Sequence, residues 1–110
     1  MHIKEINHQC ATACVQSNPY ILLEQFNYKA VHDIMVKINH IWYCKDGTVR
    51  VPTEDEIKET ATDLMKSLVE SDQPNGESSC GGLMVCKFTW KHMQYTRYSL
   101  VYCPVETSNY

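Results

Sequence analysis

Two segments of the chain repeat apolar residues with the period of an amphipathic helix. The first stripe consists of Val31, Ile34, Met35 and Ile38. Asn27 stands before it as an N-cap, so a helix is predicted over about residues 28–39. The second stripe consists of Ile57, Ala61, Leu64, Met65, Leu68 and Val69. Thr53 and Glu56 have the spacing of a capping box, which predicts where this second helix begins.

Strand patterns lie in the middle and near the end of the chain. Asp46-Gly47 is a strong turn signal, so residues 42–51 are predicted to form a small β-hairpin. Residues 83–90 and 95–102 flank a polar turn and predict a longer antiparallel hairpin. Side chains alternate along 83–90: Met84, Cys86, Phe88 and Trp90 share one face, while Leu83 and Val85 share the other. Both sides of this strand are therefore expected to be partly buried.

The remaining segments have less regular patterns. Residues 1–25 are interpreted as an arm or a pair of short strands, with the second strand through 20–23 and a break at Asn18-Pro19. Residues 71–82 are rich in Ser, Asp, Asn and Gly and are predicted to be a surface loop. The 110 residues fit one α+β domain, with two helices packed on a mostly antiparallel sheet of about four or five strands.

Composition and charge narrow the functional classes. The net charge is −3, and the ten Lys and Arg residues are scattered, which argues against general nucleic-acid binding. The first eight residues are polar, unlike a signal peptide, and no apolar stretch approaches the ~20 residues that span a bilayer. We therefore expect a cytoplasmic protein with no membrane association.

The six cysteines are Cys10, Cys14, Cys44, Cys80, Cys86 and Cys103. In a reducing cytosol we expect them to be small, mostly buried thiols rather than disulfides. His8, Cys10 and Cys14, with His32 or His40, could supply zinc ligands. The two tight ligand pairs of a structural zinc site are missing from the sequence, so no metal and no other cofactor is expected.

Two groups of residues are candidates for ligand binding. The first is Cys80-Gly81-Gly82, where an exposed thiolate could react or backbone amides could bind an anion. Nucleophilic catalysis would also need a base such as His32, His40 or His92 nearby, and glycines before a strand also serve close packing. The second group is aromatic and basic, and consists of Trp42, Tyr43, Trp90, Tyr95, Tyr98 and Tyr102 with Arg50, Lys87, Lys91 and Arg97. The complete candidate set is Trp42, Arg50, Cys80, Gly81, Gly82, Trp90, Arg97 and Tyr98.

Three interpretations of the aromatic and basic residues stay open. Aromatic rings beside Arg or Lys can stack on a nucleotide and pair with its phosphate. Tyr and Trp are also common anchors at protein interfaces. Aromatic residues favour strands for reasons of packing alone.

Residues 26–102 combine Phe26-Asn27-Tyr28 opening a helix, Trp42, the helix start Val51-Pro52-Thr53, Leu64, and Gly81-Gly82 before a closing hairpin. Together these features resemble a group of small, largely uncharacterised proteins encoded by bacteriophages and prophages. Members of the group often have phenylalanine where this chain has Leu83. The resemblance implies a mobile-element origin and the cytoplasm of a bacterial host, without an established activity.

Together these observations predict a non-catalytic binding protein that acts through a protein–protein interaction with a host protein, with counter-defence among its candidate roles. One alternative is a sponge that sequesters a nucleotide-like signal molecule. A second alternative is a small cysteine-dependent enzyme. A sheet this rich in aromatic residues can exceed what two helices cover, which leaves room for a homo-oligomer.

Overall fold

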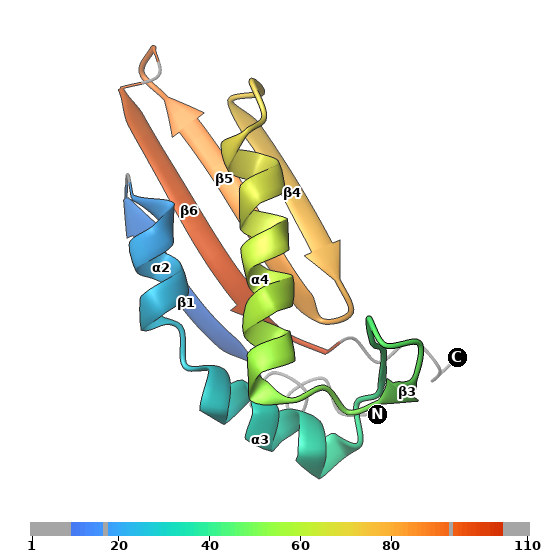
Figure 1. The fold of residues 1–110 in the computed structure, drawn as a ribbon. Coiled ribbons are helices and arrows are strands. Elements are labelled where there is room, and N and C mark those ends of the chain that lie inside the picture. Colours follow the sequence, from blue (N-terminus) through green and yellow to red (C-terminus); the bar gives the residue numbers. More distant parts are fainter. Residues whose placement is uncertain (1–9, 17, 93, 105–110) are drawn as a thin grey trace, which may run out of the picture.

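The structure, a computed structural model, describes residues 10–16, 18–92 and 94–104 (Figure 1). The described residues form three helices, a four-stranded sheet and a two-stranded sheet, which confirms the predicted α+β class. In chain order the elements are β1 (Ala11–Gln16), α2 (Pro19–Gln25), α3 (Tyr28–Ile38), β2 (Trp42–Tyr43), β3 (Val49–Arg50), α4 (Glu54–Val69), β4 (Asn75–Cys80), β5 (Leu83–Trp90) and β6 (Tyr95–Tyr102).

The larger sheet has the strand order β1-β6-β5-β4, and every neighbouring pair is antiparallel. The long hairpin β5–β6 forms its centre, with eight residues in each strand. Its register runs from Leu83 opposite Tyr102 to Trp90 opposite Tyr95. The predicted second hairpin is therefore confirmed, and the two outer strands pair with it from either side.

The helices cover one face of this sheet. In Figure 1, α4 crosses in front of β4 and β5, and α2 lies in front of β1 and β6. Alternate side chains of the central strands point into the layer between sheet and helices. Those fully removed from solvent are Leu83, Val85, Leu100 and Tyr102, and they join Leu22, Val31, Met35, Ile57, Ala61 and Met65 from the helices. Apolar burial between these two layers holds the fold together.

The two predicted helices begin where their capping residues predicted. The Asn27 side chain accepts a hydrogen bond from the Ala30 N–H, and α3 ends at Ile38 before Asn39 in the left-handed conformation. At the start of α4, Thr53 and Glu56 form both hydrogen bonds of the capping box. Local side-chain chemistry fixed both helix starts.

The strand predicted through residues 20–23 is wrong, because these residues belong to helix α2. The Asn18 side chain accepts a hydrogen bond from the Tyr20 N–H, and Pro19 occupies the first turn. Proline is well suited to that position, since its missing N–H would be unpaired there anyway. The Asn18-Pro19 break is therefore a helix start.

The loop predicted over residues 71–82 is wrong in its second half, where β4 pairs with β5 from Asn75 opposite Phe88 to Cys80 opposite Leu83. This strand lies at the edge of the sheet, and most of its side chains are exposed. A polar sequence can form this strand because the backbone hydrogen bonds to β5 specify it and the side chains need not be apolar. This is why its composition resembles that of a loop.

The expectation of reduced, mostly buried cysteines is also wrong. Cys10 and Cys103 form a disulfide. Ala11 is opposite Tyr102 in the β1–β6 register. Cys10 precedes Ala11 and Cys103 follows Tyr102, so the same register brings the two cysteines opposite each other. Of the others, Cys44 is buried, Cys86 is half-buried, and Cys14 and Cys80 are exposed.

The predicted small hairpin is confirmed. Trp42 pairs with Arg50 and Tyr43 with Val49, and the Cys44 N–H donates to the Thr48 carbonyl. Gly47 has φ +89°, which an L side chain rarely adopts, so the turn needs glycine at this position. The hairpin lies beside the end of the sheet where β4 turns into β5 (Figure 1).

Candidate binding surface

One face of the four-stranded sheet is not covered by the described helices. Both α2 and α4 lie on the other face (Figure 1). We call the uncovered side the open face and define it by its residues on the two central strands. These are Met84, Cys86, Phe88 and Trp90 of β5, with Tyr95, Arg97, Ser99 and Val101 of β6. The alternation recognised in residues 83–90 thus separates a buried face from an open one.

Three aromatic side chains form a continuous row at the hairpin-turn end of the open face. The Phe88 and Trp90 ring centroids are 5.2 Å apart with planes inclined by 32°, and Trp90 stacks on Tyr95 at 5.7 Å and 25°. We call Phe88, Trp90 and Tyr95 the aromatic row. Its outer members stay open to solvent, with Phe88 53% and Tyr95 40% exposed.

Two cations lie against this row. The Arg97 guanidinium carbon is 5.9 Å from the Trp90 ring centroid, and the Lys91 Nζ is 5.6 Å from that of Tyr95. Arg97 is directly opposite Phe88 in the β5–β6 register. Neither cation is ion-paired with an acidic residue in the part of the chain that the structure describes. Their charges are therefore available to a ligand.

Charge is divided unevenly between the two layers. Residues 83–104 contain three Lys or Arg residues and no Asp or Glu. Since the whole chain has ten basic and 13 acidic residues, the remainder has seven against 13. Five of these acids, Glu54, Asp55, Glu56, Glu59 and Asp63, lie on α4 in the helix layer. The net charge of −3 therefore conceals a basic hairpin.

The third basic residue of the hairpin, Lys87, points toward the helices. Its Nζ donates hydrogen bonds to the carbonyls of Leu68 and Ser71, 3.3 and 3.1 Å away, at the end of α4. A cation suits the negative end of a helix dipole. Lys87 is thus engaged in the fold, which leaves Lys91 and Arg97 as the cations of the aromatic row.

The predicted glycine pair lies at the opposite end of the sheet. Gly81 has φ +61°, and a Cβ there would be 2.7 Å from the Trp42 Nε1. A Cβ on Gly82 would be 2.9 Å from the Tyr102 ring and 3.1 Å from the Pro104 Cα. These glycines permit close packing, one of the two interpretations left open by the sequence.

Trp42 belongs to a partly buried group that the sequence did not reveal. The His40 Nδ1 and the Tyr102 hydroxyl are 2.6 Å apart, and the His40 ring meets that of Trp42 edge to face at 6.1 Å. Burial lowers the pKa of His40 and raises the pKa of Tyr102 to about 12, so both are neutral at pH 7. The Trp42 Nε1 is buried with no hydrogen-bond partner among the described residues. No local signal connects residues so distant in sequence.

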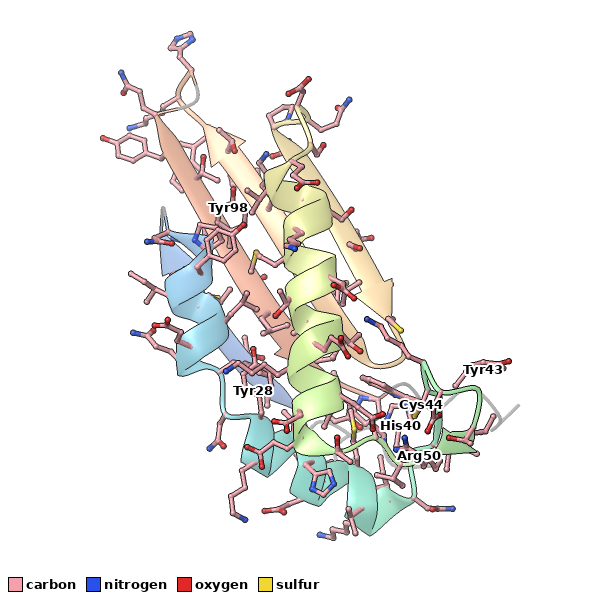
Figure 2. The ribbon with its side chains drawn as sticks, viewed as in Figure 1. Tyr28, His40, Tyr43, Cys44, Arg50 and Tyr98 are labelled. Atoms are coloured by element: carbon pink, nitrogen blue, oxygen red, sulfur yellow. A yellow bond between two sulfur atoms is a disulfide. The ribbon has the colours of Figure 1, made fainter. Side chains whose placement is uncertain are left out.

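Arg50 is fully engaged by the protein itself. Its Nε donates to the Thr48 hydroxyl, and its two Nη atoms donate to Glu56 at 2.8 and 2.9 Å, to Asp46 and to the Val51 carbonyl. These acceptors use all the N–H groups of a guanidinium. Figure 2 shows Arg50 beside Cys44 and His40 near the small hairpin. Its role is to join this hairpin to the start of α4.

The remaining candidates do not join the aromatic row. Tyr98 is 7% exposed and lies on the helix-covered face, where Figure 2 places it near α2 and α4. Cys80 ends the edge strand β4 and is exposed. Of its proposed bases, His40 contacts Tyr102, and His92 follows β5 at the far end of the hairpin.

The eight candidate residues are therefore separated. Trp90 and Arg97 come together on the open face, whereas Trp42, Gly81 and Gly82 pack together at the other end. Phe88 was not among the predicted binding residues, and Tyr95 belonged to the aromatic and basic group but not to the set of eight, although the period-two alternation of the hairpin places both beside Trp90.

Metal ligation receives no support from the described residues, which contain no group of three or more His, Cys, Asp or Glu residues able to hold a metal ion. Of the zinc ligands considered from the sequence, Cys10 is in the disulfide and His8 lies outside the described residues. No described helix is long and apolar enough to cross a bilayer.

Comparison with known proteins gives no match to a protein-family model, to a curated protein or to a solved structure.

Proposed function

We propose that the protein is a non-catalytic binding protein that uses the open face of its sheet. The observation that carries this proposal is the aromatic row, whose outer rings Phe88 and Tyr95 are exposed on a face that none of the described helices covers. A ligand that removes apolar surface from water gains about 25 cal/mol of binding free energy per Å². Trp and Tyr residues grouped in this way are common binding hot spots.

A binding role is favoured over catalysis because the candidate base His40 and the candidate cation Arg50 already have partners within the protein. His40 contacts Tyr102, and Arg50 donates its N–H groups to neighbouring acceptors. Cys80, the candidate nucleophile, is exposed at the end of an edge strand. A cysteine nucleophile needs a base within hydrogen-bond reach.

The resemblance to phage and prophage proteins supports a role in a bacterial host, where the protein counters host defence, although the Cys10–Cys103 disulfide is unusual for the reducing cytoplasm expected from the sequence. A host protein and a nucleotide-like molecule are the two ligand classes considered from the sequence. A specific observation favours the second class, because Arg97 and Lys91 bring positive charge to the aromatic row.

Native mass spectrometry of protein purified from bacterial cells tests the binding surface. The test variant is Phe88→Ser with Trp90→Ser, and the control is Tyr43→Ser, an 80% exposed ring on the small hairpin (Figure 2). We expect the wild type and the control to retain a bound species, or a second copy, that the test variant loses. Identical spectra from all three proteins would contradict the proposal, provided that their urea unfolding midpoints show them to be folded.

A further inference from the structure

Resting on the proposed function, we propose that the open face binds single-stranded nucleic acid. Bases stack on the aromatic row of Phe88, Trp90 and Tyr95, and Lys91 and Arg97 neutralise the adjoining phosphates.

The ring geometry suits planar ligands. The planes of neighbouring rings in the row are inclined by only 32° and 25°, so the three side chains form an approximate stack. A base can extend such a stack at the Phe88 end, where the outer ring is 53% exposed, while at the other end Lys91 lies over the Tyr95 ring. Stacking of one base on an aromatic side chain raises affinity by about tenfold and is tolerant of sequence.

The local charge suits an anionic backbone. Lys91 and Arg97 already lie over the rings of Tyr95 and Trp90, so they flank the position of a stacked base. The hairpin residues 83–104 contain no acidic residue that would repel a phosphate. The acidic residues of α4 lie in the helix layer on the other side of the sheet. Glu77 of the edge strand β4 is opposite Cys86 and so lies on the open face, but the turn end of this face, where Lys91 and Arg97 adjoin the aromatic row, carries the positive charge that suits a phosphate chain.

The shape of the surface distinguishes a single strand from other forms of nucleic acid. A duplex hides the faces of its bases, so it cannot stack on the row. A free nucleotide offers a single base, and sites for small molecules usually enclose their ligand. The row lies on a sheet surface and spans two strands, which suits successive bases of one strand.

Because only two cations are available, we expect the affinity for a single strand to depend weakly on salt concentration. Each phosphate neutralised on a single strand contributes about 0.7 to the slope of log K against log salt concentration, so two contribute about 1.4. A general nucleic-acid binder with many phosphate contacts has a far steeper slope. This expectation agrees with the scattered basic residues of the sequence.

Fluorescence anisotropy with a fluorescein-labelled oligothymidine strand of about 12 nucleotides tests the inference. We expect the wild type to bind this strand at least about tenfold more tightly than a duplex of the same length or free thymidine monophosphate. Phe88→Ala should weaken binding by about tenfold through the loss of one exposed stacking ring. Arg97→Gln should lower the salt slope by about 0.7, a readout that does not depend on Phe88.

Tyr43→Ala, which removes an exposed ring far from the aromatic row, should bind as the wild type does. Lack of strand binding, equal binding of the duplex, or an equal loss in Tyr43→Ala would overturn the inference. Binding of the free nucleotide as tightly as the strand would also overturn it, in favour of a single-nucleotide site. The oligothymidine can fail to bind while native mass spectrometry still finds a ligand that the Phe88 and Trp90 variant loses. That result would support the binding surface and refute its assignment to nucleic acid.

Discussion

The indole of Trp42 lies directly against Gly81, so that a Cβ on residue 81 would be only 2.7 Å from Nε1. Trp42 begins the small hairpin, and Gly81 lies in the turn between β4 and β5. This contact joins the hairpin to the end of the sheet. Gly81 also has φ +61°, so glycine is needed there both for its conformation and for its small size.

We expect Gly81→Ala to destabilise the protein by about 2–4 kcal/mol, through backbone strain and overpacking against Trp42. Gly47→Ala is the matched control, because Gly47 also has positive φ but has nothing within 4 Å of an added Cβ. The control should lose only the conformational part, about 1–2 kcal/mol. Urea unfolding measures both free energies, and equal losses would refute the role of the Trp42 contact.

Acid should weaken the connection between the small hairpin and α4. Hydrogen bonds from Arg50 and Thr53 hold the pKa of Glu56 at about 2, and those from Thr48 and Arg50 do the same for Asp46. Both values lie below the ordinary values near 4, so the unfolded chain binds more protons between about pH 4 and pH 2. The stability that these carboxylates provide is therefore present above about pH 4 and is lost as the pH falls toward 2.

Glu56→Gln tests this dependence. The gap in urea midpoint between wild type and Glu56→Gln should be largest at neutral pH and should shrink as the pH approaches about 2. Glu24→Gln, a change at an exposed position of α2, serves as the control. A gap that stays constant with pH would show that the charge of Glu56 contributes nothing to stability.

His40 should make stability depend on pH in a second, higher range. Burial lowers the pKa of His40 below the ordinary value of about 6.5, so the unfolded chain binds the proton first. The contribution of neutral His40 is complete above about pH 6.5 and is lost as the pH falls toward the folded-state pKa. Unfolding of the wild type between about pH 8 and pH 5 should show this loss.

The variant His40→Gln should lose this pH dependence, whereas His92→Gln, at an exposed position, should retain it. Proton NMR titration of His40 provides an independent measurement. A folded-state pKa at or above about 6.5 would be inconsistent with burial of the imidazole against Tyr102.

The Cys10–Cys103 disulfide should contribute strongly to stability, because the two cysteines are 93 residues apart. Cross-links across long loops typically stabilise by about 2–4 kcal/mol. Cys103→Ser should be less stable by this amount than Cys86→Ser, which leaves the disulfide intact. Reductant should lower the stability of the wild type and leave that of Cys103→Ser unchanged. A wild type insensitive to reductant would mean that the bond contributes little.

Elements with a strong local signal could be predicted from the sequence. The Thr53–Glu56 capping box and the apolar stripe after it defined α4. The turn at Asp46-Gly47 and the alternation in β5 and β6 defined the two hairpins. In each case the residues that specify the structure lie within a few positions of one another.

Features that depend on distant partners could not be predicted. The polar strand β4 exists because it pairs with β5, and the disulfide forms because the β1–β6 register brings Cys10 opposite Cys103. For the candidate surface, Trp90 and Arg97 were identified, but excluding Trp42 and Tyr98 from it required knowing where each side chain packs. Arg50 has the composition of a ligand-binding residue, and only its hydrogen bonds reveal its structural role.

The opposite charges of the helix layer and the hairpin give the molecule an electric dipole across its thickness. Near a negatively charged polymer, a dipole of this direction experiences a torque that turns the open face of the sheet toward the polymer and the acidic helix α4 away from it. Encounters would then begin with the aromatic row already facing the partner. Since orientation commonly limits how fast two surfaces associate, the segregated charges favour rapid capture of such a partner even though the protein as a whole repels it.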